Sequence, residues 1–127
     1  MAGVVVDASR WIDFFAGQGA EDVDEALAQG AAILPPIVVA ELMSGARTAR
    51  ARAAIGELLQ DAPVHATPLE HWIEVGSLRQ RLAQKGLRVT IPDAHVAQCA
   101  LERDALLLTG DAVFEQIARH VPLRLPG

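Results

Sequence analysis

Two aspartates stand directly after short apolar runs, where side chains could do chemistry. Asp7 follows the β-branched run Val4–Val6, and Asp111 follows residues 106–109. Such runs are typical of buried strands, and ligands of open α/β sheets bind beyond the carboxyl ends of the strands. Each aspartate taken alone also fits a helix N-cap or a turn.

Glu41 is the sharpest single signal in the chain. It lies within residues 37–43, a helical segment that is apolar on nearly every side, so we expect this helix to be buried. A buried, ionised glutamate is costly unless it is paired or binds a metal ion. A salt bridge to Arg10 or Arg47 is the alternative explanation.

Asp93 follows Pro92 in the first turn of another expected helix. The helix macrodipole favours an acid in this turn, which is the simplest explanation for the residue. The same dipole predicts a lowered pKa for Asp93, which would keep its carboxylate ionised for a metal ion.

Four carboxylates close together would repel one another unless cations lay between them. Mg²⁺ and Mn²⁺ accept oxygen ligands and retain waters. Two such ions about 3.5–4 Å apart can activate water for phosphodiester hydrolysis. The candidate metal and catalytic residues are Asp7, Glu41, Asp93 and Asp111, which only the fold could bring together.

The elements that must position these residues alternate along the chain. We expect strands at residues 4–6, 31–34, 64–66, 106–109 and 123–125. We expect helices after Ser9 as cap and at residues 21–29, 35–45, 48–60, 69–85, 92–103 and 111–119, the sixth with small residues that allow close packing. Alternation implies parallel strands with right-handed crossovers. The predicted fold is a three-layer α/β/α sandwich with a mostly parallel central sheet, formed as one domain over residues 1–127.

Composition restricts the function classes. The net charge of −5 and a pI near 5.2 argue against a general nucleic-acid binder, although not against a nuclease whose acids hold metal. The longest uncharged apolar run, residues 31–40, is about half the length that a bilayer requires. A single cysteine, Cys99, fits a reducing compartment, so we expect a cytoplasmic protein.

Other groups of residues give weaker indications of function. The four histidines have no paired spacing and the cysteine has no cysteine partner, so the sequence predicts no zinc site. A receiver-type signalling domain would need an acidic pair after its first strand, but Ala8 follows Asp7. A domain that acts only through protein partners remains an alternative. Two basic clusters fit solvated faces or an RNA-backbone contact: Arg47, Arg50 and Arg52, then Arg79, Arg81, Lys85 and Arg88.

Four segments in order resemble a PIN-domain ribonuclease. They are residues 4–9 with Trp11 and Ile12, residues 40–42 with Gly45, residues 92–97, and residues 107–111 with Phe114. Length and segment order are similar to the VapC toxins of bacterial toxin–antitoxin pairs.

This resemblance implies that the four acids form a Mg²⁺- or Mn²⁺-dependent site that cleaves RNA. It further implies a homodimer and a VapB-like antitoxin partner. Ser9 and Thr109 match small hydroxyl positions near the site in the family. Many relatives carry another acid where this chain has Val113, so this chain offers one carboxylate fewer for a second metal ion.

Overall fold

The computed structural model describes residues 3–127, and within that range it contains three strands and seven helices. The strands are β1 (Val4–Val6), β2 (Ala32–Ile33) and β3 (Leu106–Leu108). The helices are α1 (Ala8–Phe15), α2 (Glu21–Ala28), α3 (Pro36–Gly45), α4 (Ala49–Asp61), α5 (Leu69–Gln84), α6 (Ile91–Arg103) and α7 (Val113–Ala118). None of the helices in this range is long and apolar enough to cross a membrane.

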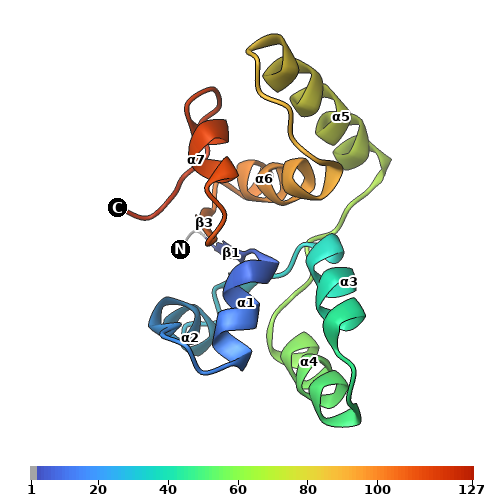
Figure 1. Cartoon of the computed structure of the whole chain (residues 1–127), viewed down its shortest axis with the longest axis vertical. Coiled ribbons are helices and arrows are strands. Elements are labelled where there is room, and N and C mark those ends of the chain that lie inside the picture. The colour runs from blue at the N-terminus through green and yellow to red at the C-terminus, as the bar shows by residue number, and fades with distance from the viewer. Residues whose placement is uncertain (1–2) are drawn as a thin grey trace.

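The strands form a parallel sheet in the order β2-β1-β3. Val4 of the central strand lies opposite Ala32 on one side and Leu106 on the other. Figure 1 shows the visible strands between α6 on one side and α1 and α2 on the other. The predicted α/β class and parallel pairing are confirmed. All three strands end toward the same edge of the sheet, where Asp7 follows β1.

Two predicted strands do not form. Residues 64–66 and 123–125 each contribute a single isolated bridge, Leu34 with Val64 and Leu106 with Arg124. Prolines flank both segments, Pro63 before the first and Pro122 before the second. Proline has no N–H for a ladder, so the pairing ends after one residue pair.

Helix α6 is the element that packs most centrally. It contacts β1, β3, α3, α5 and α7, and residues 94–100 are all buried. Small side chains such as Ala94 and Ala97 allow this close approach, as the sequence predicts. Asp93 directly precedes this buried stretch, so the packing of α6 fixes where the residue lies.

Helix α3 is less buried than predicted. Val38 and Leu42 are buried, four residues apart on one face, whereas Ala40 and Glu41 are exposed. Only one face of this apolar helix therefore packs into the core. The other face, which includes Glu41, is open to solvent in the single chain.

Candidate metal centre

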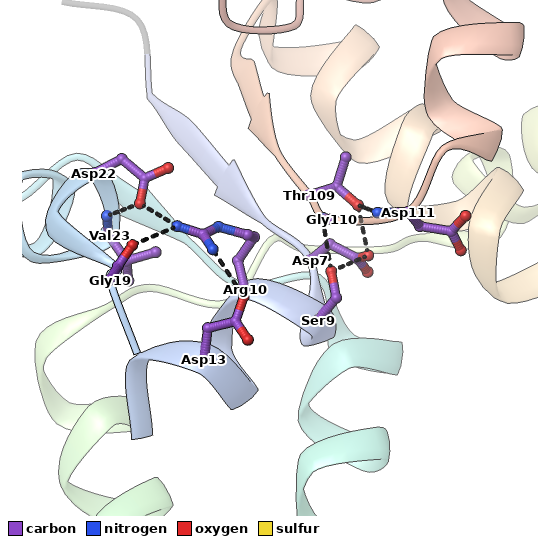
Figure 2. Close-up of polar contacts among 10 residues, drawn as sticks. All are labelled: Asp7, Ser9, Arg10, Asp13, Gly19, Asp22, Val23, Thr109, Gly110 and Asp111. Carbon is purple, nitrogen blue, oxygen red and sulfur yellow. Dashed lines mark hydrogen bonds and ion pairs between the residues drawn. The ribbon is translucent and has the colours of Figure 1, made fainter. Parts of the chain in front are cut away.

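Asp7 ends β1 and occupies the N-cap position of α1, but its carboxylate does not cap that helix. Ser9 Oγ and Thr109 Oγ1 instead both donate to Asp7 Oδ2, at 3.1 and 2.9 Å (Figure 2). Asp7 is only 8% exposed. The expectation that Ser9 caps α1 is wrong, because Ser9 lies inside that helix and orients Asp7. Two hydroxyls from opposite ends of the chain thus hold one carboxylate.

Asp111 lies beside Asp7 because the loop after β3 is joined to α1. Gly110 N–H donates to Ser9 Oγ at 3.0 Å, and Asp111 N–H donates to Thr109 Oγ1 at 3.0 Å. The Asp111 Oδ1 atom accepts from Val113 N–H, so one oxygen stabilises the start of α7. The turn interpretation of Asp111 therefore holds for one of its two oxygens. Val113 itself offers no carboxylate.

Asp93 lies in the first turn of α6, behind Thr90, whose hydroxyl accepts from Asp93 N–H at 3.2 Å. Burial raises the pKa of Asp93, a hydrogen bond from Thr90 lowers it, and the charges of Asp111 and Asp7 raise it further. The net direction is upward, so the predicted lowering by the helix N-terminus is wrong. Desolvation and neighbouring negative charge outweigh the helix dipole.

Glu41 faces the other acids from α3. Partial burial raises its pKa, and the charges of Asp7 and Asp93 raise it further. No salt bridge within residues 3–127 involves Glu41, and Arg10 pairs instead with Asp13 and Asp22, at 2.8 and 2.6 Å (Figure 2). The expectation that Glu41 is buried is wrong, and the alternative explanation, a salt bridge to Arg10 or Arg47, is not formed.

The four acids share one electrostatic environment. The charges of Asp7 and Asp93 raise the pKa of Glu41, and those of Asp111 and Asp7 raise the pKa of Asp93. Asp7 and Asp111 are linked through Thr109. Among residues 3–127, no lysine or arginine forms an ion pair with any of the four. Uncompensated carboxylates from four elements are a donor set that suits a hard divalent cation.

A groove of about 600 Å³ lies between α1, α3 and α4. Apolar side chains such as Ile12, Phe15, Leu42 and Ile55 line it. Glu41 also lines the groove, so its carboxylate belongs both to the groove wall and to the acidic group.

A second polar cluster, which the sequence did not predict, is buried between α5, α6 and the segment before α5. His65, His71 and Cys99 each bring a potential ligand atom within 4.8 Å of the others, and His95 and Glu102 join them through hydrogen bonds. Burial lowers the pKa of His95 to about 4 and raises that of Cys99 to about 12. The positions 95, 99 and 102 share one face of a helix, which is the signal available in the sequence.

A parallel sheet with carboxylates gathered beyond its strand ends defines an α/β domain with an acidic site. The PIN domain family model matches residues 4–120, and the chain belongs to the PIN-domain family. No match was found among curated proteins.

Solved structures share the same fold. VapBC2 from Rickettsia felis, bound to a DNA fragment from its promoter, matches with a TM-score of 0.80 at 21% identity, covering 97% of this chain and 96% of that one. DNA-bound VapBC from Salmonella typhimurium matches with 0.79 at 21%, covering 99% and 98%. VapBC-1 from nontypeable Haemophilus influenzae matches with 0.75 at 20%, covering 97% and 96%. The chain is thus a PIN domain whose fold is similar to that of VapC toxins.

Proposed function

We propose that this protein is a metal-dependent endoribonuclease and the toxin of a toxin–antitoxin pair. The observation that carries the proposal is the gathering of four carboxylates without a cationic partner in residues 3–127. Membership of the PIN family and similarity to chains in VapBC structures support it.

Asp7, Glu41, Asp93 and Asp111 would hold Mg²⁺ or Mn²⁺. A bound ion supplies activation of water and stabilisation of the leaving oxygen in phosphodiester hydrolysis. Ser9 and Thr109 fix Asp7 Oδ2, which leaves Oδ1 without a hydrogen bond from residues 3–127 and available as a ligand.

The second oxygen of Asp111 accepts no hydrogen bond from this part of the chain either, because only Oδ1 accepts from Val113 N–H. Each of these aspartates therefore keeps one oxygen oriented and one oxygen for the site. Hydrolysis by water needs no attack from the RNA 2′-hydroxyl, so the expected products carry a 5′-phosphate and a 3′-hydroxyl.

The partner proposed for the groove is an apolar segment of a VapB-like antitoxin. The groove is continuous with the acidic group through Glu41, so a segment lying in it could place an arginine among the carboxylates. The planar guanidinium suits carboxylates and would compete with metal for them. By the same family relationship we propose a homodimer that acts in the cytoplasm, where its RNA substrate is found.

The test is an RNA cleavage assay with Mg²⁺ or Mn²⁺. We expect cleavage by the wild type, its loss in EDTA, and a loss of at least about a hundredfold in Asp7→Asn, because the missing carboxylate weakens both metal binding and water activation. Asp61→Asn is the matched control, since Asp61 is exposed at the end of α4 and is expected to cleave normally. Equal cleavage by both variants, or a wild type that binds its antitoxin but cleaves no RNA, would contradict the proposal.

A further inference from the structure

The buried histidine cluster forms one continuous chain of hydrogen bonds. Glu102 contacts His71 Nδ1 at 2.9 Å, and His71 Nε2 contacts His95 Nδ1 at 2.7 Å. The His95 Nε2 atom accepts from the backbone N–H of Ile37 at 3.4 Å. This series of hydrogen bonds therefore runs from Glu102 in the last turn of α6 to His71 on α5, returns to His95 on α6, and ends on α3.

The acceptor at one end, the Glu102 carboxylate, and the donor at the other, Ile37 N–H, fix the direction of every proton in this series of hydrogen bonds. The pKa of Glu102 is lowered, because hydrogen bonds from His65, Gln98 and His71 outweigh its burial, so its carboxylate accepts. His71 must then carry its proton on Nδ1, which leaves Nε2 as an acceptor. His95 must donate to that atom from Nδ1, which leaves its own Nε2 as the acceptor that Ile37 N–H requires.

The contact to Ile37 replaces a missing helix cap. The first N–H groups of a helix have no partner within it, and the N-cap residue Pro35 has no side-chain acceptor to offer. The Ile37 N–H is met by His95 from another helix. Glu41 lies four residues after Ile37, on the same face of α3, and His95 is the second residue after Asp93 on α6. The contact thus joins the two helices that carry Glu41 and Asp93.

The positions of the protons on the histidine rings argue against a zinc ion in the cluster. Arg103 Nε–H donates to His65 Nδ1 at 2.8 Å, so a metal ion on His65 Nε2 would require a ring without any proton. A metal ion on His71 Nδ1 would move the His71 proton to Nε2. His71 Nε2–H would then donate to His95 Nδ1, so the His95 proton would lie on Nε2 and face the Ile37 N–H, donor against donor.

We propose that Glu102, acting through His71 and His95, is a positioning residue that holds the first turn of α3 and so places Glu41 opposite Asp93. This role rests on the proposed metal site, because it concerns the spacing of two of its carboxylates. Trp72 stacks on His95 with ring centroids 4.7 Å apart and covers the chain of rings on one side. Burial and stacking keep the rings in the orientation that the hydrogen bonds need.

The first test is the tautomer of each ring in the wild type, measured by ¹⁵N NMR of histidine at neutral pH. We expect Nδ1–H at His71 and at His95. Glu102→Gln removes the anion that selects this direction, so we expect a mixture of tautomers at both rings. Nε2–H at either ring in the wild type would overturn the proposal, whether or not the variant folds.

The second test is Mn²⁺ affinity, measured by titration calorimetry on folded protein. We expect Glu102→Gln to weaken binding roughly tenfold, the lower end of the effect of groups that orient metal ligands. Glu74→Gln removes the same charge from an exposed position on α5 and is expected to bind as the wild type does. Equal affinities in both variants would overturn the positioning role.

A pair of substitutions at His95 covers the case in which Glu102→Gln does not fold. His95→Gln keeps an acceptor near Ile37 N–H, whereas His95→Leu removes it, so only the leucine variant should lose Mn²⁺ affinity. Equal affinity in these two variants contradicts the role. A wild type with the expected tautomers but no Mn²⁺ binding would instead overturn the proposed function and, with it, the positioning role.

Discussion

Asp7 shows how one side chain can look ordinary in sequence and be specialised in the fold. Its N-cap position suggests a local role, yet its carboxylate accepts from Ser9 and from Thr109, which lies 102 residues away. Both hydroxyls donate to the same oxygen, Oδ2, and so fix the orientation of the carboxylate. The two hydroxyls thus fix one carboxylate oxygen of the residue that we propose as a metal ligand.

Asp93 is expected to destabilise the metal-free protein. Its pKa is raised above 3.8 in the fold, so at pH values from about 4 up to the raised pKa the folded state binds more protons than the unfolded state. Stability conferred by this group is therefore lost as the pH rises through that interval. Asp93→Asn removes the penalty, and in EDTA at pH 7 we expect its Tm to rise by about 2–4 °C.

The measurement is thermal unfolding from pH 4 to pH 7 in EDTA, with Asp61→Asn as the control. The difference between Asp93→Asn and the wild type should grow with pH, and Mn²⁺ should stabilise the wild type more than the variant. The lowered pKa of Glu102 makes stability rise with pH instead, but it does so equally in the wild type and in Asp93→Asn, so it cancels in the comparison. A pH-independent difference would contradict the repulsion among the carboxylates.

The local sequence pattern was enough to predict the helices and the three strands that form the sheet. The alternation of apolar runs with helical periodicity predicted β1, β2, β3 and all seven helices described in residues 3–127, within a few residues at their ends. The strand β1 can be predicted from its own residues, because a strand buried on both faces of a parallel sheet is a continuous β-branched run.

Two features depended on information that no local window contains. The burial of α3 depends on which neighbours cover it, and an apolar sequence does not say that only one face will be covered. The direction of the pKa shift of Asp93 depends on Asp7 and Asp111, which approach only through the fold. The histidine cluster is a third case, since His65 and His71 reach α6 from another part of the chain.

The start of α4 carries the basic cluster nearest the groove. Arg47, Arg50 and Arg52 are exposed, and Arg50 lines the same groove as Glu41. If they follow the RNA backbone, replacing all three by alanine should weaken RNA binding about tenfold or more and reduce the slope of log K against log salt by about two to three.

Fluorescence anisotropy with a labelled RNA at several salt concentrations measures both quantities. The charge-matched comparison replaces Arg79, Arg81 and Arg88, which lie on and after α5. An equal effect of both triple variants would indicate a general charge effect. An unchanged salt slope in the first variant would assign that cluster to a solvated face.

At the scale of the molecule, a protein with net charge −5 should repel RNA unless cations are bound. The apolar groove that Glu41 lines is the surface that we propose for control by a partner. We expect expression of the chain alone to arrest growth and co-expression of the antitoxin to restore it through a direct complex. Glu41→Gln should be non-toxic and, if an arginine binds among the acids, should bind the antitoxin about tenfold more weakly.

Growth curves and calorimetry of the purified complex measure these outcomes, with Glu57→Gln, an exposed residue of α4, as the control. Arrest by Glu41→Gln at wild-type levels would contradict a role of that carboxylate in toxicity. Harmless expression of the intact, folded wild type in a host without the antitoxin would count against the toxin assignment.

We propose that four carboxylates from separate elements hold one divalent-cation site. The most direct test is an anomalous-scattering map of crystals grown with Mn²⁺, because it locates the ion without assuming any activity. We predict a peak about 2.1 Å from carboxylate oxygens of Asp7 and Asp93, with Glu41 and Asp111 around it. Mn²⁺ bound elsewhere, for example at the histidine cluster, with none between these four acids, would contradict the account.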